Sequence, residues 1–353
     1  MNKFTSITTR IFPQSLFLLL LCVLLASCVI SINTGSSNSS CQNNCALGPG
    51  INGVQVYVEP NDGEQVITNA IRGAQRSVWL EIYILSDTNV IHALEDAANN
   101  GIDVRVMLEP HPFGEGSSTI TRTLDELQAA GIKAQDSDPA FPLTHEKGMI
   151  IDGKIAYIMT SNFSRSGLGG SSSTQNREYG IIDTNTQDVQ AVIAIFNADW
   201  NHTSAQFNDP NMVVSPVNSR SILSSLVGSA HHTLFIEAEE MDDSSMESAL
   251  VSAAQHGVTV EVILPPFSSL SSSSTQGIAT LRQGGVQVRE DPRLYMHAKI
   301  IIADDLRAFV GSENFSSQSL DQNRELGIIV ADTGVLGKLQ STFQSDWNDS
   351  RAA

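Results

Sequence analysis

Two histidine–lysine pairs with matched spacing are the residues best suited to chemistry in this sequence. They are His145, Lys147 and Asp152 in one segment, and His297, Lys299 and Asp304 in the other. Residues two apart on a strand face the same side, so each histidine and its lysine would contact one ligand. Lysines neutralise phosphoryl oxygens, and paired histidines can serve as nucleophile and proton donor. The pattern predicts a phosphodiester site made from two halves.

Polar residues after each motif extend this site. Asp152 and Asp304 begin segments typical of hairpin turns, where we expect a structural role for their carboxylates. The return strands end in residues expected to bind the substrate phosphate: Thr160, Asn162, Ser312 and Asn314. Further along, Glu178 and Glu325 occur in repeated Gln-Asn-Arg-Glu segments. A carboxylate on the second ring nitrogen fixes the tautomer of a histidine, so these glutamates are expected to orient the two histidines.

The whole body of the chain is an internal repeat. Residues 77–82 recur as 232–237, and residues 101–106 recur as 257–262. Apolar runs of strand length alternate with segments of helical period closed by glycine, which predicts an α/β architecture. Both halves end in a helical pattern with Phe and Trp, which we interpret as core residues.

At these motifs the sequence resembles the phospholipase D superfamily, whose signature is H-x-K-x4-D followed by Gly, Gly or Ser, any residue and Asn. The second copy fits fully, whereas the first has Met159 and Thr160 at the Gly and Ser positions. The resemblance implies a pseudo-twofold pair of α/β sandwich halves, residues 54–205 and 206–353, with the active site at their interface. It also implies a phosphohistidine intermediate and no metal or other cofactor. In that family the first histidine is usually the nucleophile, which assigns this role to His145 and the general acid to His297.

Several functions are compatible with this chemistry. The leading expectation is hydrolysis of the head-group ester of a glycerophospholipid at a membrane surface, giving phosphatidic acid and an alcohol. The alternatives are transfer of the phosphatidyl group, as in cardiolipin synthases, then a nuclease, then a non-catalytic lipid-binding protein. The catalytic unit is expected to be monomeric.

Composition narrows these alternatives. Hydrophobic residues make up 41% and charged residues 16%, which excludes wholesale disorder. The net charge of -18 repels polyanions and argues against a nucleic-acid partner. Neither H-E-x-x-H nor G-x-S-x-G occurs, so the sequence favours neither a zinc protease nor a serine hydrolase of those types.

The N-terminal segment has the features of a targeting signal. Its apolar run over residues 16–26 is shorter than the roughly 20 residues that cross a bilayer and is typical of a secretion signal. Residues 1–27 resemble a lipoprotein signal peptide, with cleavage before Cys28 and acylation of its thiol. Residues 28–53, rich in Ser, Asn and Gly, would be a flexible tether. The sequence thus predicts an exported, membrane-anchored lipoprotein, and leaves open whether Cys41 and Cys45 form a disulfide.

Overall fold

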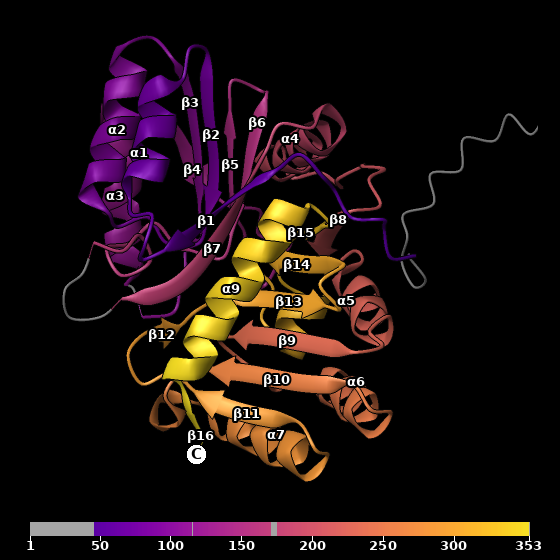
Figure 1. The fold of residues 1–353 in the computed structure, drawn as a ribbon. Coiled ribbons are helices and arrows are strands. Elements are labelled where there is room, and N and C mark those ends of the chain that lie inside the picture. Colours follow the sequence, from indigo (N-terminus) through magenta and orange to yellow (C-terminus); the bar gives the residue numbers. More distant parts are fainter. Residues whose placement is uncertain (1–45, 115, 171–174, 353) are drawn as a thin grey trace, which may run out of the picture. The chain divides into compact units, whose positions relative to one another are not determined.

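Each half of the chain forms one mixed β-sheet with helices packed against it (Figure 1). The computed structural model describes residues 46–114, 116–170 and 175–352, all within one compact unit, Ser39–Ala353. The signal segment, Cys28, Cys41 and Cys45 lie outside the described residues. Both halves combine strands and helices in nearly the same order, so the predicted α/β architecture of two repeated halves is confirmed.

The first sheet has the strand order β1-β7-β6-β5-β2-β3-β4. Its strands are β1 (Gln55–Glu59), β2 (Ser77–Ile82), β3 (Asp103–Leu108), β4 (Lys133–Asp136), β5 (Lys147–Ile151), β6 (Ile155–Met159) and β7 (Asn176–Asp183). Strands β2, β3 and β4 are parallel, and the remaining neighbours are antiparallel. The helices are α1 (Gln65–Gly73), α2 (Thr88–Asn99), α3 (Ser117–Ala129) and α4 (Thr186–Trp200).

The second sheet repeats this plan in the order β16-β11-β10-β9-β13-β14-β15-β8. Its strands are β8 (Met212–Ser215), β9 (Thr233–Ala238), β10 (Thr259–Leu264), β11 (Gln287–Glu290), β13 (Lys299–Ala303), β14 (Arg307–Gly311), β15 (Glu325–Val330) and β16 (Arg351–Ala352). The helices are α5 (Ser219–Gly228), α6 (Ser244–Gln255), α7 (Ser272–Gln283), α8 (Ser317–Asp321) and α9 (Thr333–Asp349), with a 3-10 turn at Phe267–Ser269. The short strand β12 (Tyr295–Met296) leaves this half and pairs with β7 of the first.

Three apolar cores hold these layers together. Helices α1, α2 and α3 bury their apolar residues against one face of the first sheet, and α5, α6 and α7 do so against the second (Figure 1). The third core joins the halves, because Ile158 of β6 clusters with Ile300 of β13 and Val310 of β14, together with residues of α4 and α9. Burial of this shared apolar surface fixes β5 relative to β13. Among the helices of the described ranges, none combines the length and apolar composition that a membrane crossing requires.

The structure shifts the expected alignment of the first repeated strand by one residue. In β2, Ile82 pairs with the motif lysine of the first half, and in β9, Ala238 pairs with that of the second. Ile82 therefore corresponds to Ala238 and not to Glu237. A slip of one residue exchanges the two faces of a strand. The correct register makes Tyr83 and Glu239, the residues that follow β2 and β9, equivalent.

Both motif aspartates lie at the hairpin turns expected for them. Asp152 and Asp304 have φ of 58° and 53°, a left-handed conformation that aspartate tolerates better than most residues. The Asp152 carboxylate accepts hydrogen bonds from the backbone N–H groups of Gln75, Arg76 and Ser77. Asp304 does the same for His231, His232 and Thr233. These donors hold the pKa of both carboxyl groups below the ordinary value, against the opposing effect of partial burial. The same hydrogen bonds attach each turn to the start of β2 or β9.

The C-terminal part of the expected tether is packed on the body. Ile51 is buried, its N–H donates to the carbonyl of Ile329 at 3.0 Å, and its carbonyl accepts from the N–H of Ala331 at 2.8 Å. The N–H of Gly50 donates to Asn211 Oδ1 at 3.0 Å. Residues 46–53 therefore belong to the folded unit, because an apolar side chain and two backbone bonds offset the entropy that a free coil would keep.

Candidate active site

The segment before each motif crosses to the other half. The N–H of His145 donates to the carbonyl of Arg324 at 2.8 Å, and the N–H of Arg324 donates to the carbonyl of Leu143 at 2.9 Å. In the second half, Met296 of β12 pairs with Arg177 of β7. Each histidine is thus delivered to the seam by backbone hydrogen bonds with the opposite half.

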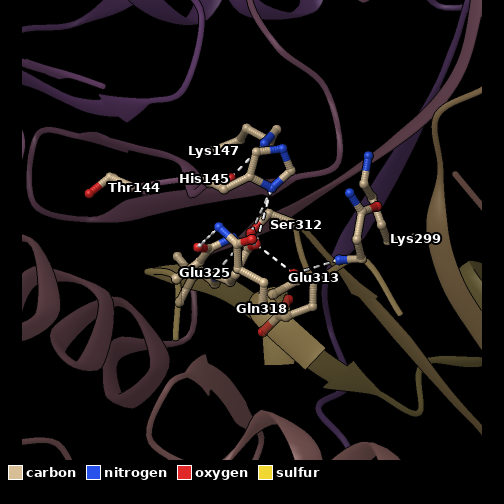
Figure 2. A network of polar contacts seen from close by, with 12 residues as sticks. Thr144, His145, Lys147, Lys299, Ser312, Glu313, Gln318 and Glu325 are labelled. Atoms are coloured by element: carbon tan, nitrogen blue, oxygen red, sulfur yellow. Dashed lines mark hydrogen bonds and ion pairs between the residues drawn. The ribbon is translucent and has the colours of Figure 1, made fainter. Parts of the chain in front are cut away.

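The orienting carboxylates are exchanged between the halves. His145 Nδ1 lies 3.0 Å from Oε2 of Glu325, whose side chain stands across the seam from it (Figure 2). His297 Nδ1 lies 2.7 Å from Oε1 of Glu178. Both glutamates are fully buried. With an N–H on Nδ1 donating to a carboxylate, Nε2 of each ring is the nitrogen that faces chemistry. The sequence named both glutamates, but only the structure shows that each serves the other half.

The hydroxyl groups of Thr160 and Ser312 contact the strands that carry the orienting glutamates. Thr160 Oγ1 donates to Glu178 Oε2 at 2.6 Å and accepts from the N–H of Tyr179. Ser312 Oγ accepts from the N–H of Leu326. Both residues are fully buried, since β6 and β14 end beside the neighbouring strands β7 and β15. Their contacts support the orienting strands, and binding of substrate phosphate by these hydroxyls stays a prediction.

Other side chains also hold the two orienting carboxylates. Asn176 Nδ2 donates to Glu178 Oε1 at 3.0 Å, and Ser319 Oγ donates to Glu325 Oε1 at 2.6 Å. Burial opposes ionisation of Glu325, but the interaction with His145, the Lys147 charge and the Ser319 hydrogen bond keep the pKa of Glu325 below its ordinary value. The carboxylate on His145 is therefore ionised and fixed in place.

Both motif lysines are fully buried at the base of the site. Lys147 Nζ donates to the carbonyl of His145 at 2.5 Å and lies 5.1 Å from the ring centre of Tyr83. Burial lowers the pKa of Lys147 to about 7, in spite of the Glu325 charge. Lys299 Nζ donates to the carbonyl of His297 and, at 2.7 Å, to Glu239 Oε2. Only the second lysine has a carboxylate as a direct partner among the described residues.

The two asparagines that follow the return strands have buried side-chain oxygens with no partner in the described part of the chain. Asn314 Nδ2 donates to Glu239 Oε2 at 3.3 Å. Asn162 stands at the corresponding place in the first half. Amide groups with unfilled hydrogen-bonding capacity at the seam can serve a ligand.

Tyr83 and Glu239 flank the two histidines and were missed from the sequence. The ring of Tyr83 packs edge-on against His145 with the centroids 4.6 Å apart. Glu239 Oε2 lies 3.3 Å from His297 Nε2. The alignment that pairs Ile82 with Glu237 hid their equivalence, because its extension by one residue pairs Tyr83 with Ala238. An alignment that matches Glu81 with Glu237 would have found it.

The two histidines differ in their electrostatic surroundings. Burial, together with the charges of Lys147 and Lys299, lowers the pKa of His145 against the opposing effect of Glu325. His297 instead has Glu178 at Nδ1 and Glu239 at Nε2. The surroundings therefore match a neutral His145, whereas the ring of His297 lies between two carboxylates.

Met159, at the position where the family signature has glycine, lies in an apolar core. Met159 is fully buried in the core of the first half, so the departure from glycine is absorbed by packing.

The arginines of the repeated segments form ion pairs. Arg324 pairs with Asp199 at 2.9 Å, and Arg177 pairs with Asp346 at 2.5 Å. The arginines of the repeated segments therefore hold acids of α4 and α9 across the seam.

One cluster within the described ranges has the composition of a cation site: Glu81, Glu146 and Asp199. Arg324 already binds Asp199. Burial raises the pKa of Glu81 and, together with the Asp199 charge, raises that of Glu146 to about 8. These carboxyl groups take up protons where a metal would need them ionised, so the cluster fits a buried acid network better than a metal centre.

Comparison with known proteins places this geometry in a family. The family profile described as "Cardiolipin synthase, PLD-like domain" matches residues 67–200 and 223–347. Cardiolipin synthase 2 of Staphylococcus epidermidis is 24% identical over 86% of this chain and 70% of its own length. Cardiolipin synthase 1 of Bacillus anthracis is 25% identical over 85% of this chain and 66% of its own. The structure of phosphatidylserine synthase from Haemophilus influenzae superposes with a TM-score of 0.67 at 11% identity, covering 86% of this chain and 88% of that one.

Proposed function

The chain belongs to the PLD-like family of cardiolipin synthases within the phospholipase D superfamily, and on this premise we propose that it transfers phosphatidyl groups between glycerophospholipids. As a member of that superfamily it is an enzyme. The leading expectation from the sequence was hydrolysis, with transfer as the alternative. Relatives named cardiolipin synthase support the transfer reaction. The observation that carries the proposal is the pair of histidines, each with Nδ1 on a buried carboxylate of the other half.

The first step uses the difference between the histidines. Neutral His145 attacks phosphorus through Nε2, and a phosphorus–nitrogen bond forms as the bond to the head-group oxygen breaks. His297 donates its Nε2 proton to that oxygen, so the head group leaves as a neutral alcohol. Lys147 and Asn162 are placed to stabilise charge on the phosphoryl oxygens. The product is a phosphatidyl group on His145 and a neutral His297.

The second step reverses these roles. His297, now neutral, takes the proton of an incoming hydroxyl as its oxygen attacks phosphorus and the bond to His145 breaks. If the acceptor is the glycerol head group of phosphatidylglycerol, the product is cardiolipin. If it is water, the product is phosphatidic acid. The chemistry at the histidines is the same, so the acceptor decides between transfer and hydrolysis.

A product analysis tests the proposal. The full chain is incubated with phosphatidylglycerol vesicles, and lipids and released glycerol are quantified, with His145→Ala as control. We expect cardiolipin and glycerol in equal amounts, both absent in the control. Phosphatidic acid as the main product would instead establish hydrolysis, and release of nucleotides from single-stranded DNA alone would establish a nuclease.

We also propose that Cys28 is acylated after export and anchors the enzyme to a membrane, as the sequence predicts. The packed segment 46–53 leaves residues 28–45 as the span between anchor and body. The mass of the N-terminal peptide from the membrane fraction tests this, and an unmodified thiol on Cys28 would contradict it.

A further inference from the structure

One carboxylate oxygen lies where three donors of the second half meet. Glu239 Oε2 is 2.7 Å from Lys299 Nζ, 3.3 Å from Asn314 Nδ2 and 3.3 Å from His297 Nε2. The lysine and histidine belong to the second motif, and the asparagine follows its return strand. These are the donors that a bound phosphodiester needs on this side of the site.

A carboxylate oxygen and a phosphoryl oxygen make the same demands on such donors. Both carry negative charge and accept short charge-assisted hydrogen bonds from ammonium, imidazolium and amide groups. A phosphoryl oxygen cannot take this position while Glu239 Oε2 fills it, and like charges at contact distance repel. Substrate and Glu239 therefore compete for one set of donors.

Among its described residues, the first half has no anion equivalent to Glu239 beside His145 and Lys147. Tyr83 holds the corresponding position, and its ring contacts His145 and Lys147 without supplying an anion. In the second half the Glu239 side chain is 19% exposed, whereas that of Lys299 is 0% exposed. Glu239 thus enters from the open side of the site and has a path out, while the lysine beneath it is fixed.

We propose that Glu239 is a resident anion that occupies the phosphate subsite of the second half in the free enzyme and leaves it when the substrate phosphodiester binds. The inference rests on the proposed function, since it takes a phosphodiester as the ligand. Displacing Glu239 costs binding energy, which a lipid offsets through contacts of its remaining parts. Inorganic phosphate has no such contacts, so Glu239 selects lipid diesters against small phosphate anions.

Glu239 is displaced by competition and not by protonation. Burial alone would raise its pKa, but the positive charges of His297 and Lys299 outweigh burial and hold the pKa well below the ordinary value. Its neighbour Glu240 behaves differently, because burial and the charge of Glu239 raise the pKa of Glu240 to about 7. The two adjacent glutamates therefore form a matched pair, in which only Glu239 touches the three donors.

Calorimetric binding of inorganic phosphate to the full chain tests the proposal without any turnover. Glu239→Gln removes the charge and keeps the shape, and should tighten phosphate binding by about tenfold or more, since a like charge at the subsite is removed. Glu240→Gln should change the dissociation constant by less than about threefold, because Glu240 makes no hydrogen bond or ion pair with the three donors, all of which contact Glu239. Unchanged or weaker binding by Glu239→Gln, or equal gains in both variants, would overturn the proposal.

Steady-state kinetics with a soluble nitrophenyl phosphodiester supply the second readout. Glu239→Gln should lower KM. Glu239→Ala also removes any contact that Gln retains, and it should likewise tighten phosphate binding and lower KM. A fall in kcat with unchanged phosphate affinity would show that Glu239 acts on the alcohol instead. Because phosphate binding needs no lipid product, a failure of phosphatidyl transfer would leave this test intact.

Discussion

The first and second halves share one frame and differ in what surrounds the histidine. Both halves have the same strand order around the motif, the same hairpin with its aspartate and the same crossed glutamate. Beside the histidine rings the halves differ at the equivalent positions Tyr83 and Glu239. Duplication of a motif therefore fixes where the groups lie, while in the proposed mechanism neighbouring residues decide which histidine attacks and which donates a proton.

The strongest test of this difference is removal of each histidine. His145→Ala should lose about 10³-fold or more in kcat toward every phosphodiester, because no nucleophile remains. His297→Ala should lose a similar factor with a lipid but only about tenfold with a nitrophenyl diester, whose leaving group needs no proton. Initial rates on both substrates check this. Equal losses on both substrates for both variants would remove the assignment of nucleophile and acid.

The crossed carboxylates give the next largest effect. Glu325→Gln should lower kcat by about 100-fold on both substrates, because His145 is no longer held in the tautomer whose Nε2 is free to attack phosphorus. Glu178→Gln should lower it comparably with lipid and much less with the nitrophenyl diester. Each variant would therefore behave like a defect in the opposite half. If Glu178→Gln instead lost activity equally on both substrates, as expected for His145→Ala, the assignment of Glu178 to His297 would be wrong.

Two exposed apolar side chains, one in each half, extend the comparison to the lipid surface. Phe113 is 92% exposed, and its N–H donates to the Tyr83 hydroxyl at 2.6 Å beside the His145 pocket. Leu306 is 67% exposed in the hairpin after Asp304. Phe113→Ser should reduce activity on vesicles by about tenfold, by losing apolar contact with the bilayer. Leu306→Ser is the matched control and should change it little.

Activity of Phe113→Ser on a soluble diester should stay near that of the unaltered enzyme. Equal losses for Phe113→Ser and Leu306→Ser on vesicles would show that neither residue guides the site to lipid. Vesicle sedimentation with each variant measures the binding part of the effect directly.

The lowered pKa of Lys147 predicts a pH effect on substrate affinity. With a pKa of about 7, the ammonium that neutralises the phosphoryl oxygen is present below pH 7 and is lost as the pH rises. KM should rise about fivefold between pH 7 and pH 8. Lys147→Arg keeps its charge over this range, so its KM should not follow the same rise. A pH-independent KM in the unaltered enzyme would contradict the buried position of Lys147.

The smallest expected effect concerns the aspartate hairpin turns that both halves contain. Asp152→Ala and Asp304→Ala should each lower the free energy of unfolding by about 1–3 kcal/mol, since each removes hydrogen bonds from backbone N–H groups to a carboxylate. The pKa of both carboxyls is lowered, so this stability is present above their ordinary pKa and lost as the pH falls through the folded value. Denaturant unfolding of both variants measures it.

Asp305→Asn is the control for these turns, because Asn tolerates the positive φ and the Asp305 side chain bonds only Gln340 at an exposed site. It should change the free energy of unfolding by less than about 0.5 kcal/mol. A large difference between Asp152→Ala and Asp304→Ala would break the equivalence of the two frames.

The sequence predicted the architecture and the motif residues because both depend on periodicity and spacing. Strand parity placed His145 and Lys147 on one side, and the repeat implied a partner for each. It could not predict which glutamate meets which histidine, since that depends on β12 and the segment before His145 crossing the seam. The contact of Thr160 could not be predicted for a related reason: a hydroxyl at a strand end has several neighbours, and only the fold shows that it donates to Glu178.

The exchange of carboxylates also bears on how such a chain can change over generations. A substitution at Glu325 impairs the histidine of the first repeat, and one at Glu178 impairs that of the second. Neither repeat can be replaced alone by a foreign copy unless the newcomer brings a compatible glutamate for its neighbour. The two repeats are therefore constrained as a matched set at these glutamates, whereas Tyr83 and Glu239 show that equivalent positions of the two copies can take up separate tasks.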